Sequence, residues 1–188
     1  GIVVVAGPTG SGKTTTLYAA LRSLMRPEVA VFSVEDPVEY RLDGVTQVPV
    51  NREAGVGIAA AMRHVMRQDP DVIMVAEMRD EETLRLCATA ALTGHLVLTT
   101  MHTNDAVQAI RRMADAGLER FLIADTLVGV LAQRLVRKTH LECGTMHEVT
   151  DAQRQWLGRA GVSEPPDTLT RGMGCAECHN TGNRGRTT

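Results

Sequence analysis

Residues 7–14 combine small, flexible residues with a lysine and a threonine in an order that suits phosphate binding. They read Gly-Pro-Thr-Gly-Ser-Gly-Lys-Thr, and glycines let backbone N–H groups converge on an anion. The apolar run 2–5 before them is typical of a buried strand, and the leucine spacing in 15–24 predicts a helix after them. The sequence therefore predicts a nucleotide loop between strand and helix, made of Gly7, Pro8, Thr9, Gly10, Ser11, Gly12, Lys13 and Thr14.

Two side chains of this loop are predicted to complete the site. Lys13 is expected to reach the β- and γ-phosphates of a bound nucleotide, and the hydroxyl of Thr14 is expected to hold Mg²⁺. The N-terminus of the following helix adds a partial positive charge. ATP and Mg²⁺ are therefore the expected cofactors.

Carboxylates that follow strand-like runs are the next candidates. Glu77 comes directly after the apolar run 72–76, where its carboxylate could orient or deprotonate an attacking water. A solvated loop acid is the alternative. Position 76 is alanine, where many P-loop ATPases keep an aspartate beside Mg²⁺. Glu35 and Asp36, at the end of another β-rich run, are the candidates for that role, unless they only form a strand-end turn.

Two histidines flank the expected strand 96–101. Ligands of parallel sheets bind at the carboxyl ends of strands, so His102 is expected to lie near the phosphates and to sense or stabilise the γ-phosphate. His95 precedes the same strand and lies at its opposite end, so its position alone assigns it no role. A structural role is the alternative for both residues.

A histidine and three cysteines near the C-terminus have the spacing of a structural zinc site. Two pairs, each separated by two residues, would form a tetrahedral Cys₃His set: His140, Cys143, Cys175 and Cys178. Unmetallated thiols are the alternative, and His147 or His179 could take the place of the first histidine. The remaining cysteine, Cys87, lies inside a helix pattern and is expected to be a core thiol.

Strand-like and helix-like segments alternate over residues 1–137. This alternation predicts an α/β fold with a mostly parallel sheet covered on both faces. Residues 138–188 are polar, and the abrupt ends indicate a fragment of a longer protein. The expected strands are 2–5, 29–34, 38–42, 45–50, 72–76 and 96–101, with a hairpin turn at 43–44, and the expected helices are 15–24, 58–67, 80–93, 106–116 and 121–136.

Composition narrows the class of protein. A chain of 188 residues with 44% hydrophobic content and a net charge of −2 is globular and has no overall basic field to recruit nucleic acid or anionic lipid. No apolar run approaches the roughly 20 residues of a membrane-spanning helix. No direct contact with nucleic acid is therefore expected.

Four stretches resemble the Walker A, aspartate-box, Walker B and histidine-box motifs of the ATPase superfamily of type II secretion and type IV pili. They are GPTGSGKTTTLYAAL, VEDPVEY, RQDPDVIMVAEMRD and LTGHLVLTTMHTNDA. The resemblance covers nearly the whole chain, and the trailing cysteine knuckles are similar to those of the secretion and pilus-extension branch. It implies a RecA-like P-loop ATPase core over 1–137 and a truncated metal-binding insert, a small zinc-knuckle subdomain, over 138–188.

The resemblance also implies roles for individual residues. Residues 7–14 would be the nucleotide loop, Glu35 would belong to the aspartate box, and Glu77 would be the catalytic glutamate. His95 and His102 would be the histidine-box pair. ATP, Mg²⁺ and a structural Zn²⁺ would be bound.

Family members form hexameric rings at the cytoplasmic face of the inner membrane. The resemblance therefore implies a peripheral homo-hexamer that works with an inner-membrane platform protein and an adaptor, and whose ATP hydrolysis powers assembly of a pilus or pseudopilus in protein secretion. Two other interpretations stay open, a conjugation- or DNA-uptake-type secretion ATPase and a module that binds ATP without turnover. A P-loop kinase is disfavoured, because no arginine-rich lid or acceptor pocket is recognisable.

Several features depart from the family pattern. Ala76 replaces the usual glycine before the catalytic glutamate, His140 replaces a cysteine, and Asn183 replaces an aromatic residue. Zinc binds histidine as well as cysteine, so the second change preserves the site. The N-terminal domains of the family, whose arginines complete the nucleotide site, are missing. We therefore expect this sequence to bind ATP better than it hydrolyses it.

Overall fold

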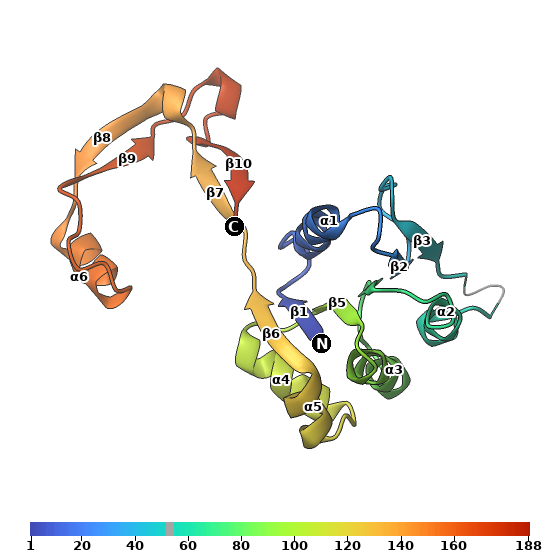
Figure 1. Ribbon diagram of the computed structural model, residues 1–188. Coiled ribbons are helices and arrows are strands. Elements are labelled where there is room, and N and C mark those ends of the chain that lie inside the picture. The colour runs from blue at the N-terminus through green and yellow to red at the C-terminus, as the bar shows by residue number, and fades with distance from the viewer. Residues whose placement is uncertain (52–54) are drawn as a thin grey trace. The chain divides into compact units, whose positions relative to one another are not determined.

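The larger part of the structure is built on a parallel sheet (Figure 1). The computed structural model describes residues 1–51 and 55–188, and within them six strands form this sheet in the order β3-β2-β4-β5-β1-β6. Every neighbouring pair is parallel, so all the strands end at the same edge. The strands are β1 (Ile2–Ala6), β2 (Val31–Glu35), β3 (Thr46–Pro49), β4 (Val72–Val75), β5 (Leu96–Met101) and β6 (Leu127–Ala132).

Helices cover both faces of this sheet, as Figure 1 shows. One face packs against α1 (Lys13–Leu24), through Leu17, Tyr18 and Leu21. This arrangement confirms the predicted α/β class, because a parallel sheet is apolar on both faces and needs cover on each. The other face is covered by α2 (Ile58–Val65), α3 (Glu81–Leu92), α4 (Ala106–Asp115) and α5 (Arg120–Thr126).

None of the helices in residues 1–51 and 55–188 combines the length and apolar character needed to cross a lipid bilayer.

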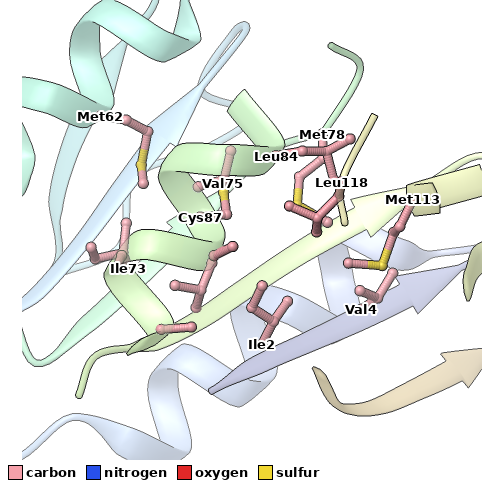
Figure 2. Close-up of a cluster of buried hydrophobic side chains, with 14 of the residues drawn as sticks. Ile2, Val4, Met62, Ile73, Val75, Met78, Leu84, Cys87, Met113 and Leu118 are labelled. Atoms are coloured by element: carbon pink, nitrogen blue, oxygen red, sulfur yellow. The ribbon is translucent and has the colours of Figure 1, made fainter. Parts of the chain in front are cut away.

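The larger hydrophobic cluster lies between the sheet and helices α2 to α5 (Figure 2). Ile2 and Val4 of β1 belong to it, together with Leu84 and Cys87 of α3 and Met113 of α4. All five side chains are buried, and removing a large apolar side chain from water contributes roughly 1.5–3 kcal/mol. Cys87 is thus the core thiol that the sequence predicted. Because β1 is anchored in this cluster, the loop that follows it starts from a fixed point.

Aspartates begin two of the helices. The carboxylate of Asp80 accepts a hydrogen bond from the backbone N–H of Thr83 at 2.8 Å, at the start of α3. The carboxylate of Asp105 accepts one from the N–H of Gln108 at 2.7 Å, at the start of α4. Such caps satisfy N–H groups that have no partner within the helix. They fix where the chain turns away from the strand ends that precede both helices.

The prediction of a single helix over 121–136 is wrong in its second half. Helix α5 ends at Thr126, and residues 127–132 form β6, which pairs in parallel with β1. The Val-Gly-Val run at 128–130 has low helix propensity, and β1 offers it the hydrogen bonds of a strand. As a consequence, the residues that follow β6 arrive at the edge of the sheet where β1 also ends.

The predicted hairpin at 43–44 is also wrong. Residues 38–42 are not a strand, and β3 pairs in parallel with β2 instead. A two-residue turn can join only antiparallel strands, whereas parallel neighbours need a longer crossover. The backbone N–H of Leu42 donates to the side chain of Gln47 at 2.8 Å rather than to a partner strand. Local turn residues therefore gave a misleading signal here.

Residues 135–188 form a second, smaller compact unit. Two antiparallel ribbons build it, β7 with β10 and β8 with β9. Gly172 and Gly182 lie so close that a Cβ on the first would collide with the carbonyl group of the second. The elements are β7 (Val136–Thr139), the 3₁₀ turn Leu141–Cys143, β8 (Gly144–Glu148), α6 (Asp151–Arg159), β9 (Thr168–Gly172), the 3₁₀ turn Ala176–Cys178 and β10 (Asn183–Thr187).

Candidate functional site

Three strand ends bring the predicted loop, carboxylate and histidine together. The loop 7–12 follows β1, Glu77 lies just beyond β4, and His102 follows β5 directly. In the sheet, β5 lies between β4 and β1. Because these strands are parallel, their carboxyl ends share one edge, where open α/β sheets bind ligands. The site is therefore assembled from segments far apart in sequence.

Close contacts require glycine in the loop itself. A Cβ on Gly7 would lie 2.5 Å from the carbonyl oxygen of Gln133 and 2.5 Å from the hydroxyl oxygen of Ser11. Gly12, immediately before α1, has a φ of 82°, in the left-handed region that favours glycine. These two glycines allow the chain to curl tightly between β1 and α1.

Lys13 is held inside this curl. Its ammonium group donates to the carbonyl oxygens of Gly7 and Pro8, both at 3.0 Å, and the residue is 8% exposed. Burial lowers the pKa of Lys13, and the nearby carboxylate of Glu77 works against that shift. Thr14, the predicted Mg²⁺ ligand, is the next residue of α1. A partly desolvated cation in the centre of a glycine loop suits an anionic ligand.

The hydroxyl of Ser11 supports the same conclusion. Ser11 is 3% exposed, and within the residues that the structure describes its Oγ has no hydrogen-bond partner. Buried hydroxyls are nearly always hydrogen-bonded, so an unpaired one beside Lys13 fits the oxygen of a bound phosphate. Pro8, Thr9 and Gly10 form the exposed rim of the loop.

Glu77 and His102 face each other across the ends of β4 and β5. The Nε2 atom of His102 lies 3.6 Å from Oε2 of Glu77, whose side chain is 17% exposed. The same oxygen accepts a hydrogen bond of 2.7 Å from Nε of Arg79, a contact that the sequence analysis did not identify. These neighbours hold the carboxylate in one orientation, as a group that positions a water molecule requires.

Glu35 ends β2 at the same edge of the sheet, but its carboxylate is engaged within the protein. The residue is 1% exposed, and its oxygens accept hydrogen bonds from Ser33 at 2.5 Å, from Gln47 at 3.0 Å and from the hydroxyl of Tyr18. Burial raises the pKa of Tyr18, and the bond to Glu35 raises it further. Glu35 therefore ties α1, β2 and β3 together, whereas the adjacent Asp36 is exposed.

The structure does not bring His95 to the nucleotide loop. Its Nδ1 lies 2.8 Å from the carbonyl oxygen of Ala90 and 3.0 Å from the hydroxyl of Thr93. The whole of β5 separates His95 from His102, and a strand advances by about 3.3 Å per residue. His95 therefore lies at the edge of the sheet opposite the nucleotide loop, and the role that the resemblance implies for it stays a prediction.

Gln133 is a residue of this site that the sequence analysis missed. It follows β6 directly, is 6% exposed, and donates from Nε2 to the carbonyl oxygen of Ser11 at 2.6 Å. Its Oε1 accepts a hydrogen bond of 2.7 Å from the hydroxyl of Thr16. The incorrect helix over 121–136 hid this position. A polar residue directly after the apolar run 127–132 is the one signal that could have indicated it.

The predicted zinc ligands come together in the second unit. The Sγ atoms of Cys143 and Cys175 lie 3.9 Å and 3.7 Å from that of Cys178, and Nδ1 of His140 lies 3.4 Å from Sγ of Cys175. All four ligand atoms lie within 4.8 Å of one another. Neither of the alternative histidines, at 147 and 179, belongs to a cluster of this kind among the described residues.

This cluster fits Zn²⁺ on geometry and on chemistry. Tetrahedral zinc with metal–sulfur bonds of about 2.3 Å requires sulfur–sulfur distances of about 3.8 Å, close to the separations observed. Burial acts to raise the pKa of Cys178, but hydrogen bonds from the backbone N–H groups of Cys175 and Gly182, together with those from the thiols of Cys175 and Cys143, lower the pKa to about 6. On the other side of His140, Nε2 lies 3.7 Å from Glu142 and 3.8 Å from Glu177, which can orient the ring.

Comparisons with known sequences match the whole chain to the group of secretion and pilus proteins that its motifs resemble. The sequence profile of a family described as "Type II/IV secretion system protein" matches residues 1–188. Type II secretion system protein E of Pseudomonas aeruginosa is 50% identical over 187 residues, which are 100% of this chain and 37% of that protein. Type IV pilus assembly ATPase TfpB of Acinetobacter baylyi is 46% identical over 186 residues, 99% of this chain and 32% of that protein. The chain spans about a third of the length of these curated relatives.

Solved structures share the fold. The pilus retraction motor PilT with bound ADP superposes with a TM-score of 0.68 at 38% identity, over 73% of this chain and 43% of that chain. The ATPase DotB of Legionella pneumophila gives a TM-score of 0.65 at 32% identity, over 76% of this chain and 42% of that chain.

Proposed function

Because this chain belongs to the type II/IV secretion system protein family, we propose that it binds and hydrolyses ATP as part of a motor that assembles a pilus or pseudopilus in protein secretion. The observation that carries the proposal is the meeting of the nucleotide loop, Glu77 and His102 at one edge of the sheet. Relatives named as type II secretion proteins and as a pilus assembly ATPase support the choice of process.

In the proposed reaction, the loop holds the nucleotide by its phosphates. Backbone N–H groups and the ammonium of Lys13 compensate the negative charge of the phosphate chain. Glu77 orients a water molecule and accepts its proton as the water oxygen attacks the γ-phosphorus and the bond to the bridging oxygen breaks. His102, 3.6 Å from Glu77, is proposed to stabilise the γ-phosphate. When bound at Thr14, Mg²⁺ supplies neutralising charge to the phosphate oxygens.

The cysteine and histidine cluster of the second unit is proposed to hold a structural Zn²⁺. His140, Cys143, Cys175 and Cys178 supply four ligands, a complete set that leaves no position for a reacting group. The metal would therefore stabilise the fold of this unit rather than take part in hydrolysis. The ligands come from segments distant in sequence, so binding would join the two 3₁₀ turns that carry the cysteines.

The larger assembly belongs to the same proposal. We infer a homo-hexamer at the cytoplasmic face of the inner membrane, in contact with a platform protein and an adaptor of the secretion or pilus machine. This inference comes from the family resemblance of the motifs at 7–21, 34–40, 67–80 and 92–106. Because the chain covers about a third of its relatives, turnover is proposed to need parts outside it, and the chain alone is proposed to bind ATP better than it hydrolyses it.

Phosphate release from ATP, measured with and without Mg²⁺ in the full-length protein, tests the proposal. Glu77→Gln should keep nucleotide binding but lose turnover by roughly 10²–10⁴-fold, the contribution of a general base. Glu82→Gln, the same change on an exposed helix position, serves as the control and should keep full activity. Binding without turnover in wild type would instead identify an ATP-binding module. A wild-type protein that does not bind ATP would refute the proposed function.

A further inference from the structure

Gln133 contacts the phosphate loop through both its backbone and its side chain. Its N–H donates to the carbonyl oxygen of Ala6 at 2.8 Å, and its own carbonyl oxygen lies against Gly7, where no Cβ would fit. Its side chain donates to the carbonyl oxygen of Ser11 at 2.6 Å and accepts from the hydroxyl of Thr16 at 2.7 Å. One buried residue therefore contacts the start of the loop, its middle and the helix after it.

The hydrogen bond from Gln133 to the carbonyl of Ser11 also fixes the direction of the Gly12 N–H, because both groups belong to the Ser11–Gly12 peptide. The carbonyl of Ser11 and the N–H of Gly12 belong to one planar trans peptide unit, so they point in opposite directions. With the carbonyl held against Gln133, the N–H of Gly12 points away from Gln133. Backbone N–H groups of a glycine loop are the donors to a bound phosphate, so the orientation of this N–H matters for phosphate binding.

The carbonyl of Ser11 determines which end of the Gln133 amide faces the loop, because a carbonyl oxygen only accepts hydrogen bonds whereas a hydroxyl can donate or accept. An amide has one acceptor oxygen and one donor nitrogen, and the hydroxyl of Thr16 donates to the oxygen. The nitrogen faces the carbonyl oxygen of Ser11, which needs a donor, and the bond from Thr16 holds the oxygen end of the amide in place. The two hydrogen bonds therefore depend on each other, and Thr16 acts on the loop through Gln133.

We propose that Gln133 is a positioning residue for the nucleotide site, which holds the Ser11–Gly12 peptide so that the Gly12 N–H faces the phosphate chain. The inference rests on the proposed nucleotide binding and adds to it a residue outside the loop motif. It assigns a function to the end of β6, the strand whose register with β1 brings Gln133 to the loop.

The test compares binding with stability in variants of the 188-residue chain. Gln133→Met keeps an unbranched side chain of similar length and removes both hydrogen bonds. Gln155→Met makes the same exchange on the exposed surface of α6 and is the matched control. Affinities for Mg-ATP and for Mg-pyrophosphate are measured by calorimetry, because pyrophosphate reports on the phosphate loop alone. The unfolding midpoint of each ligand-free protein is measured in parallel.

We expect Gln133→Met to lower the affinity for both ligands about tenfold, which is the effect of one or two lost hydrogen bonds. The measurement is made at a temperature where every variant is fully folded. Gln155→Met should bind like wild type. Thr16→Val should weaken binding in wild type but add nothing in the Gln133→Met background, because its effect passes through the amide.

Three results would overturn the inference. If Gln133→Met bound both ligands as tightly as wild type, the inference would be overturned while the proposed function stayed intact. An affinity loss explained entirely by unfolded protein would reduce Gln133 to a structural residue. Failure of the wild-type chain to bind either ligand would overturn the proposed function itself, and this inference with it.

Discussion

Replacing Gly7 by alanine tests how tightly the nucleotide loop is packed. The added Cβ would lie 2.5 Å from the carbonyl oxygen of Gln133 and 2.5 Å from Oγ of Ser11, whereas ordinary contacts begin at 3.4 Å. Neighbouring atoms must therefore move by about 0.9 Å to restore van der Waals distances. One of the two obstacles is backbone, which cannot move aside by changing a rotamer.

This movement is expected to be costly in free energy. Overpacking of this kind costs roughly 1–3 kcal/mol. The bonds from Gln133 to Ala6 and Ser11 are 2.8 Å and 2.6 Å long, so the shift would break at least one of them, and each lost bond costs about 1 kcal/mol. We expect Gly7→Ala to lower the free energy of unfolding by about 2–4 kcal/mol.

Urea unfolding followed by far-ultraviolet circular dichroism measures this loss, and calorimetry with Mg-ATP measures the accompanying loss of binding. Gly129→Ala is the control, since a Cβ at that position in β6 meets nothing within 4 Å, and its stability should change by less than about 1 kcal/mol. The reasoning would be refuted if both variants unfolded at the same urea concentration and bound Mg-ATP equally well.

Three further predictions concern charge, metal and reactivity. Lys13→Ala should weaken Mg-ATP binding about a hundredfold, because hydrogen bonds from charged groups are strong, and calorimetry showing wild-type affinity would contradict the place of the ammonium in the loop. Cys175→Ser should lose bound zinc, by metal analysis, and make residues 135–188 more sensitive to protease, while Mg-ATP affinity stays unchanged. Burial raises the pKa of Cys87 to about 12, so its thiol should resist an aromatic disulfide reagent at about pH 8 until the protein unfolds; rapid labelling of the native protein would contradict its burial.

The part of the site that could be predicted from sequence depends on local signals. The loop 7–14 carries its own spacing. Glu77 follows an apolar run and His102 follows a β-rich run, and each run is long enough to be a strand. The parallel arrangement of these strands then places their ends together without any further information. The zinc ligands could be found for a similar reason, because two short knuckles mark them. Which histidine joins them depends on the folding of the second unit, and the sequence left this open.

The end of β6 shows why the rest could not be predicted. Residues 127–132 are almost entirely apolar, and such a run does not distinguish a strand from a buried helix turn. Its conformation is decided by β1, which lies at the other end of the sheet-forming part of the chain. Gln133 was missed for this reason. The parallel pairing of β3 is a similar case, because the partner strand and not the turn at 43–44 determines its direction.

The last two residues of the first unit are both bonded inside it, which has a consequence for local unfolding. The guanidinium of Arg134 donates to the carbonyl oxygen of Asn104 at 2.8 Å, and Gln133 is bonded to the backbone of Ala6 and Ser11. The ends of a unit usually open first, because few bonds hold them. Here this end cannot open without breaking contacts of the loop 7–12, so the local stability of residues 133–134 and that of the loop are linked.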